Sequence, residues 1–476
     1  MRRVAVGLAL VALTFPFLFF LSASPAAAPL AAADDLAARG KYREARSLYA
    51  RAAALEPWRP APLLRLGEVQ FRLGQFAEAE RSYRQAVLVH PHNRAAQRGL
   101  GRTLAAQGQL VPAAAAWLSA AQAGSAAEAF YEAGLLYLDL GDLVRAEATL
   151  SRAATLAEEA GEPALARGAR LRLAFLVGRE RPAAAEAQLD LAAVEAAPGE
   201  RSRLTRAREA LRALVSVSSP AHGDALLGRG ALMAGLPSLA VDFLRRAVAA
   251  EPAYADAHAY LALALLSRGE ASEAAGAAER ALALRSGHQL ARYARAAAWR
   301  IDGRPRDAIL ELKELLATSP DEASYLLELG TACADYGDFQ AASDYVRRAV
   351  ELPEAGPDVL LAAALFHVDR GYRPEQALPW AERADAALQN AEAAIARGWA
   401  LHLVGQSDAA LGVLARAAAL DPRSARAHYY LGAALEEAGR APEALREYAR
   451  AIDLEPAGPI GQRARQSLLS LGERIP

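Results

Sequence analysis

Residues 431–456 read LGAALEEAGRAPEALREYARAIDLEP. In this stretch Gly439 separates two runs whose apolar residues recur at helical spacing. The same glycine returns every 34 residues without a slip at Gly235, Gly269, Gly303, Gly337, Gly371, Gly405 and Gly439. Earlier in the chain, Gly40, Gly74 and Gly108 keep the same interval, and Gly141 comes one residue early. The chain is therefore predicted to be a stack of nearly equal units.

Around these glycines the same residue types recur. Alanine stands five residues after most of them, and a large residue often stands nine after, as Tyr448 does in the quoted stretch. A proline often follows at position seventeen, as at Pro456, and a small residue such as Gly432 stands seven positions before. We expect a first helix that ends at the glycine and a second helix that ends at the proline, because glycine tolerates the left-handed conformation of many helix stops. The small residue lets the two helices approach closely.

These columns carry a family resemblance. The pairs Leu329-Gly330 and Leu431-Gly432, together with Ala342, Ala444 and Pro456, resemble the tetratricopeptide repeat signature. The resemblance covers about residues 26–160 and 221–458, with eleven clear repeats and one degenerate repeat. It implies an all-α, right-handed superhelical solenoid of antiparallel helix hairpins. In such a solenoid the first helices form a concave wall that docks peptides or other proteins.

The order of the units predicts two arrays. We expect a first repeat array at 29–160, a degenerate repeat with a junction helix at 161–220, a second array at 221–458 and a capping helix at 459–476. The interval 161–220 breaks the pattern but keeps helical spacing over three segments. A continuous solenoid with one eroded repeat is the alternative. In the cap, the polar residues expected to face outward are Gln462, Arg463, Arg465 and Gln466.

Residues 1–28 form a separate segment. Arg2 and Arg3 precede an apolar run at 4–21, which is the layout of a secretory signal. The run is also just long enough to cross a bilayer, so a retained membrane anchor competes with a cleaved signal. Either way the sequence predicts an exported protein of the periplasm or cell envelope, with this segment as its sole contact with the membrane.

Composition narrows the class of partner. The chain has 55 acidic and 54 basic residues, a net charge of −1, which does not favour nucleic acid as a partner. Only Lys41 and Lys313 are lysine, a bias that we attribute to a GC-rich bacterial genome. The single cysteine, Cys333, rules out an intrachain disulfide and is expected in the core.

Motifs for catalysis are absent from the sequence. None of the eight histidines begins a His-Glu-x-x-His zinc motif, and Gly40-Lys41 lacks the remainder of a phosphate-binding loop. We therefore expect no enzyme, no cofactor and no metal, although a site assembled from distant repeats leaves no trace in sequence.

The expected binding surface is a stripe on the first helices. Residues 13, 10, 6 and 3 before each turn glycine should face the groove. The first-array stripe includes Leu64, Glu68, Phe71, Arg98, Arg102 and Tyr131, and Arg300 belongs to the second-array stripe. The candidate partner-binding residues of the second array are largely apolar: Tyr293, Leu327, Thr331, Leu361, Leu365, Ile395, Trp399, His402 and Tyr429. The alternative is that these side chains merely pack first helix against first helix, or that the superhelix shields them.

The sequence thus favours an exported scaffold that binds other proteins or peptides through an apolar concave groove in the second array. A structural or regulatory subunit is the alternative. Such a subunit would belong to an envelope assembly or enzyme complex for secretion, pili or polysaccharide export and would have no catalysis of its own.

Overall fold

The structure is a computed structural model that describes residues 24–123, 127–194, 196 and 198–474. Within these residues the chain consists of α-helices joined by short turns, with one 3-10 turn and no strand. The predicted all-α class is confirmed. Most of the predicted leader, residues 1–23, lies outside the described residues.

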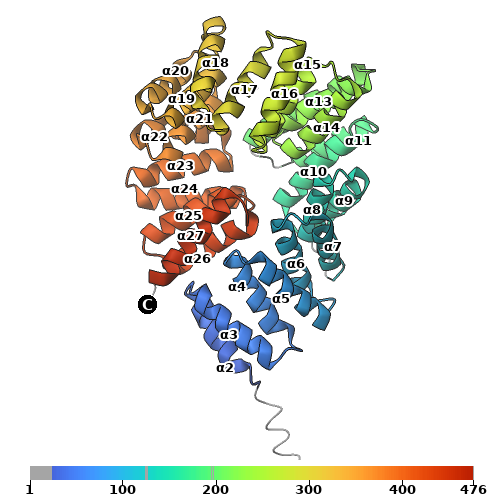
Figure 1. The fold of residues 1–476 in the computed structure, drawn as a ribbon, viewed down its shortest axis with the longest axis vertical. Coiled ribbons are helices and arrows are strands. Elements are labelled where there is room, and N and C mark those ends of the chain that lie inside the picture. The colour runs from blue at the N-terminus through green and yellow to red at the C-terminus, as the bar shows by residue number, and fades with distance from the viewer. Residues whose placement is uncertain (1–23, 124–126, 195, 197, 475–476) are drawn as a thin grey trace, which may run out of the picture. The chain divides into compact units, whose positions relative to one another are not determined.

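The helices alternate as first and second helices of hairpins, in chain order from blue to red (Figure 1). Up to residue 159 they are α2 (Ala27–Ala38), α3 (Tyr42–Leu55), α4 (Pro60–Arg72), α5 (Phe76–Val89), α6 (Arg94–Ala106), α7 (Leu110–Gln122), α8 (Ala127–Asp139) and α9 (Leu143–Glu159). The interval expected to hold three helices contains α10 (Pro163–Val177), α11 (Pro182–Ala193) and α12 (Pro198–Ala213), followed by the 3-10 turn η1 (Leu214–Ser216).

The regular alternation resumes at residue 220. The hairpins are α13 (Pro220–Met233) with α14 (Pro237–Ala250), α15 (Ala255–Ser267) with α16 (Ala271–Leu284), α17 (Gln289–Ile301) with α18 (Pro305–Thr318), α19 (Ala323–Tyr336) with α20 (Phe339–Glu351), α21 (Pro357–Arg370) with α22 (Pro374–Leu388), α23 (Ala391–Leu403) with α24 (Ser407–Leu420), and α25 (Ala425–Glu437) with α26 (Ala441–Leu454). Helix α27 (Pro459–Arg474) follows the last hairpin.

The evenly spaced glycines are the turns of these hairpins. At Gly439, for example, φ is 74°, the amide of Gly439 donates to the carbonyl of Glu436 at 3.0 Å, and the amide of Arg440 donates to the carbonyl of Leu435 at 2.9 Å. These bonds satisfy the last carbonyls of the first helix, and the left-handed residue turns the chain back. Every predicted turn glycine has a positive φ: Gly40, Gly74, Gly108, Gly141, Gly235, Gly269, Gly303, Gly337, Gly371, Gly405 and Gly439.

The small column packs directly on the large column of the same hairpin. A Cβ added at Gly398 would lie 2.7 Å from Cγ of Leu414, and one added at Gly330 would lie 2.7 Å from Cγ2 of Val346. Glycine is needed there because the second-helix side chain fills the space that a methyl group would occupy. The same pairing recurs at Gly67 with Tyr83, Gly101 with Trp117, Gly134 with Leu150 and Gly228 with Leu244.

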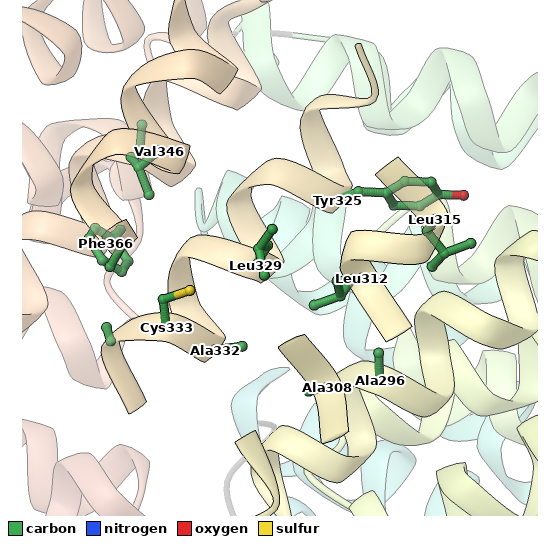
Figure 2. Packing of buried hydrophobic residues seen from close by; sticks show 13 residues of the cluster. Ala296, Ala308, Leu312, Leu315, Tyr325, Leu329, Ala332, Cys333, Val346 and Phe366 are labelled. Carbon is green, nitrogen blue, oxygen red and sulfur yellow. The ribbon is translucent and has the colours of Figure 1, made fainter. Parts of the chain in front are cut away.

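Between hairpins the core is continuous. One cluster of buried side chains runs from α17 to α21 and includes Leu312, Leu329, Val346 and Phe366 (Figure 2). Cys333 belongs to the same cluster and is buried, as expected. Each hairpin therefore buries its apolar face against its neighbours, which no single hairpin could do alone.

The chain forms two compact units. Unit 1 comprises residues up to 125 together with 435–476, and unit 2 comprises residues 126–434. In unit 2, helix α12 packs on α11, α13 and α22, with Leu204, Ala207 and Leu211 buried. In unit 1, α27 packs on α26 and buries Ala464, Leu468 and Leu471.

The cap departs from expectation at one residue. Gln462, Arg463 and Gln466 are exposed, but Arg465 is half-buried and donates from Nε to the carbonyl of Arg72 at 3.0 Å. The amphipathic pattern predicted an outward Arg465 because such a pattern reflects only residues of the same helix. It contains no information about a contact with Arg72, which is far away in the sequence.

No helix among the described residues has both the length and the apolar character needed to cross a membrane.

Candidate functional site

The nine candidate groove residues lie on five first helices of unit 2. Tyr293 is on α17, and Tyr429 is on α25; the other seven are distributed over α19, α21 and α23. Leu361 and Ile395 are buried, at 8% and 2% exposure, and the other seven are half-buried. We call these nine residues the second-array wall. None of its side chains stands free in solvent.

Aromatic contacts join neighbouring helices along this wall. The rings of Tyr293 and Tyr325 stack with centroids 5.6 Å apart, from α17 to α19. The ring of Trp399 lies 4.3 Å from that of His402 and 4.6 Å from that of Tyr430. Part of the wall therefore does pack first helix against first helix, the alternative that the sequence left open.

Near Trp399, polar contacts connect the helices on either side of α23, namely α21 and α25. The hydroxyl of Tyr430 donates to Oδ1 of Asp369 at 3.0 Å, and Arg426 forms an ion pair with the same carboxylate. Burial and the nearby Asp369 carboxylate raise the pKa of Tyr430 to about 12, so the hydroxyl remains a donor at neutral pH. These bonds connect α21 to α25 and hold the wall in one arrangement.

A second set of charged residues crosses the wall between α17 and α21. Nε of Arg300 lies 2.6 Å from Glu328, and its Nη1 lies 3.0 Å from Asp335; Arg370 pairs with the other oxygen of Asp335 at 3.2 Å. The stripe that reads largely apolar in sequence is therefore crossed by ion pairs. Its chemistry is mixed, which suits a surface that binds through both apolar and polar contacts.

A cavity of about 650 Å³ opens inside unit 2 where α8 and α10 face α23 and α25. Its size falls within the range of pockets that hold small molecules. Two residues of the predicted stripes, Tyr131 and Ile395, line it. The remaining lining residues are Ala164, Arg167, Gly168, Leu171, Arg172, Ala192, Leu204, Ala234, Gly235, Leu236, Asn390, Ala391, Glu392, Leu420, Asp421, Arg423, Ser424 and Arg426.

Basic groups gather around Tyr131. The guanidinium of Arg423 lies 4.8 Å from the centre of the Tyr131 ring and forms an ion pair with Glu132. The guanidinium of Arg172 lies 5.5 Å from the same ring and donates to the carbonyl of Gly168 at 2.9 Å. Arg172 forms no salt bridge with any residue that the structure describes. Its guanidinium still interacts electrostatically with the carboxyl of Asp139, where it opposes the burial that raises the pKa of that group.

Helix N-termini add to this positive character. Asn390 caps α23 by accepting from the amide of Ala393 at 2.9 Å, and Ser424 caps α25 by accepting from the amide of Ala427 at 3.2 Å. Both caps line the cavity, as does the first turn of α10. Four arginines line it with Glu392 and Asp421, and two of the four, Arg423 and Arg426, are paired with Glu132 and Asp369. Since the positive end of a helix dipole favours anions, the cavity suits a ligand that carries negative charge.

Sequence models of the family match most of this architecture. Three models described as Tetratricopeptide repeat match the chain, one at residues 64–127, 226–289, 302–359 and 395–459, the second at 36–88 and the third at 127–159. The first alone covers more than half of the chain. The chain belongs to the tetratricopeptide repeat family. The resemblance inferred from the turn glycines is confirmed.

Solved structures of similar fold include other tetratricopeptide repeat and related helical proteins. Yeast Tom70 is 15% identical, with 94% of this chain and 95% of that chain covered and a TM-score of 0.43. The Cut9-Hcn1 hetero-tetramer of the APC/C is 15% identical, with 97% and 98% covered and a TM-score of 0.40. A tetratricopeptide repeat protein from Parabacteroides merdae is 16% identical, with 54% and 99% covered and a TM-score of 0.40. No curated protein matches the chain.

The tetratricopeptide repeat pattern does not reveal the arginines of the cavity. Arg167 and Arg172 come from the degenerate repeat, and Arg423 and Arg426 come from a turn and helix more than 250 residues later. Each alone resembles a solvated charge on a helix. Among the described residues, no group of histidine, cysteine, aspartate and glutamate could hold a metal ion.

Proposed function

We propose that this protein is an exported scaffold without catalysis of its own, which holds a segment of another protein in the cavity of unit 2 and on the adjoining second-array wall. That tetratricopeptide repeats bind protein partners supports the general role. The proposal of a specific binding site rests on the cavity. It joins an aromatic residue, apolar side chains and arginines within one compact unit.

The leader supports export. Arg2, Arg3 and the apolar run at 4–21 would direct the chain across the inner membrane, and either cleavage or retention would leave the repeats outside the cytoplasm. The partner would then be another protein of the periplasm or cell envelope.

The test is photo-crosslinking at single positions in the native envelope. A photoreactive residue at Leu171, which is half-buried and lines the cavity, should capture one discrete partner. The matched control is Leu310 on the second helix α18, which is 64% exposed and lies outside the cavity lining. The captured protein is then identified by mass spectrometry.

Each pattern of adducts has a distinct meaning. An adduct from Leu171 that is absent from Leu310 would support the cavity as the binding site. An adduct from Leu310 alone would contradict it and favour the structural or regulatory subunit, whose contacts would use the outer second helices. No adduct from either position would also contradict the proposal.

A further inference from the structure

The last two helices of the chain contact the predicted groove-facing stripe of the first array within unit 1. Asp453 on α26 lies between two guanidinium groups of the first array: its Oδ2 is 2.9 Å from Nη2 of Arg72, and its Oδ1 is 2.7 Å from Nη2 of Arg102. The side chains are largely buried, at 17% exposure for Asp453 and 11% for Arg72. A carboxylate shared by two arginines away from water is a strong and specific contact.

A fourth charged group completes this cluster. Glu68 lies 2.8 Å from Arg72 and 3.9 Å from Arg102, and it accepts a hydrogen bond from the hydroxyl of Tyr83 at 3.1 Å. Burial alone would raise the pKa of Glu68, but Arg72 and Arg102 together lower it to about 2. We call Glu68, Arg72, Arg102 and Asp453 the clasp. Without Asp453, it would hold two positive charges against one negative charge.

Further contacts near the clasp also join α26 and α27 to the first array. Arg72 donates to the backbone carbonyl of Ala449 on α26. On α27, Arg465 donates to the carbonyl of Arg72, and the backbone of Gly472 lies so near Gly40 that a Cβ at Gly472 would come within 2.4 Å of the Gly40 carbonyl oxygen. The final two helices are therefore seated on the first two turns of the array by polar and backbone contacts.

The contacted face carries part of the predicted groove-facing stripe of the first array, although the sequence places the candidate partner-binding residues in the second array. Glu68, Phe71 and Arg102 belong to the predicted first-array stripe, and Arg102 lies 4.5 Å from the centre of the buried Phe71 ring. We propose that α26 and α27 act as an internal ligand of the first array, closing its groove-facing stripe to external acidic helices until these two helices are released. Any replacement must supply a carboxylate where Asp453 stands, because the two arginines exceed Glu68 by one charge.

The inference concerns unit 1 alone, so it stands or falls separately from the cavity of unit 2. The test compares the full-length protein with Asp453→Arg, which sets three guanidinium groups against one carboxylate, and with the milder Asp453→Asn. The double variant Arg102→Asp with Asp453→Arg restores two positive and two negative charges. The control is Asp302→Arg, which makes the same change of charge at an exposed residue of α17's end in unit 2.

Amide hydrogen exchange measures whether α26 and α27 are packed against the first array. We expect exchange in α4, α6 and α26 to rise at least tenfold in Asp453→Arg and less in Asp453→Asn, with protection restored in the double variant. Asp302→Arg should exchange like the wild type. Unchanged exchange in both Asp453 variants, or a double variant no better protected than Asp453→Arg, would overturn the proposal.

A peptide of residues 439–458, which carries the α26 sequence, tests the binding face directly. The labelled peptide should bind Asp453→Arg at least ten times more tightly than the wild type, because the wild-type face is already filled. Equal binding to both proteins would overturn internal closure. Protection of α4 that depends on protein concentration would also overturn it, since α26 would then come from a second copy.

Discussion

The hydroxyl of Tyr430 donates to Oδ1 of Asp369 at 3.0 Å, although one complete hairpin separates the helices that carry them. Trp399, on the intervening first helix α23, contacts the ring of Tyr430 at 4.6 Å. In simple repeat arrays each unit interacts only with its neighbours. Here α21, α23 and α25 form a bonded surface over three hairpins.

Replacing Tyr430 with phenylalanine should therefore lower the stability of the protein without leaving a cavity between these helices. The ring remains, and Asp369 keeps its partner Arg426, so we expect a loss of about 0.5–1.5 kcal/mol in the free energy of unfolding. Urea unfolding followed by circular dichroism measures it. Tyr336→Phe, at an exposed tyrosine of α19, is the control. Equal midpoints for the two variants would contradict a stabilising role for the Tyr430 bond.

Two classes of glycine should respond differently to alanine. At Gly398 a Cβ meets Leu414 at 2.7 Å, so Gly398→Ala should cost about 1–3 kcal/mol through overpacking. At Gly405 nothing lies within 4 Å, but φ is 81°, so Gly405→Ala should cost about 1–2 kcal/mol through backbone strain.

A double-mutant cycle with Leu414→Ala separates these causes. Truncating Leu414 makes room beside Gly398, so part of the Gly398→Ala cost should vanish in that background. The cost of Gly405→Ala should be unchanged there. All free energies of unfolding are measured by chemical unfolding. If Leu414→Ala changed the cost of Gly405→Ala instead, contact with Leu414 would not be what separates the two glycines.

The repeat geometry could be predicted because its signals are local. A turn glycine such as Gly439 and the packing pair Gly398 with Leu414 each lie within one hairpin, so a fixed spacing encodes them. The chemistry of the wall depends on pairs from different hairpins, such as Arg300 with Glu328. The stripe identified Arg300 but gave no sign of its partner, and it therefore overstated the apolar character of the face.

Acid should weaken the clasp through Glu68. Its pKa in the folded protein is about 2, below the ordinary value of 4.5, so its stabilising contribution is fully present above pH 4.5 and is lost as the pH falls toward 2. We expect Glu68→Gln to reduce the fall in stability over this interval, measured by chemical unfolding at a series of pH values. Glu44→Gln, at an exposed carboxylate of α3, is a control for charge removal from the same unit. The expectation fails if the Glu68→Gln profile is as steep as the wild type.

Export can be tested with a reporter that is active only outside the cytoplasm, fused after residue 33. Because Arg2, Arg3 and the apolar run at 4–21 resemble a secretory signal, the intact leader should give an active reporter, and deletion of residues 2–22 should abolish activity. The mass of the mature chain separates cleavage from retention. An active reporter without the leader would argue against this segment as the export signal.

The positive charge of the cavity should govern binding of the partner. Arg172→Glu changes the cavity by two charges at an arginine that forms no salt bridge with the described residues, and circular dichroism checks that the fold is kept, because Asp139 interacts electrostatically with Arg172. The matched control is Arg348→Glu on α20, because Arg348 is exposed and likewise lies over a tyrosine ring, that of Tyr345, at 5.8 Å. Both variants change the net charge equally, so only a local effect can distinguish them.

We expect Arg172→Glu to lower the yield of the Leu171 crosslink at least tenfold and Arg348→Glu to leave it unchanged. The wild-type yield should also fall as salt rises, since a partner held by charge is screened. Equal losses in the two variants would mean that net charge alone matters. Because an acidic segment seated beside Tyr131 must encounter Arg172, an unchanged yield in Arg172→Glu would exclude such a segment from the cavity.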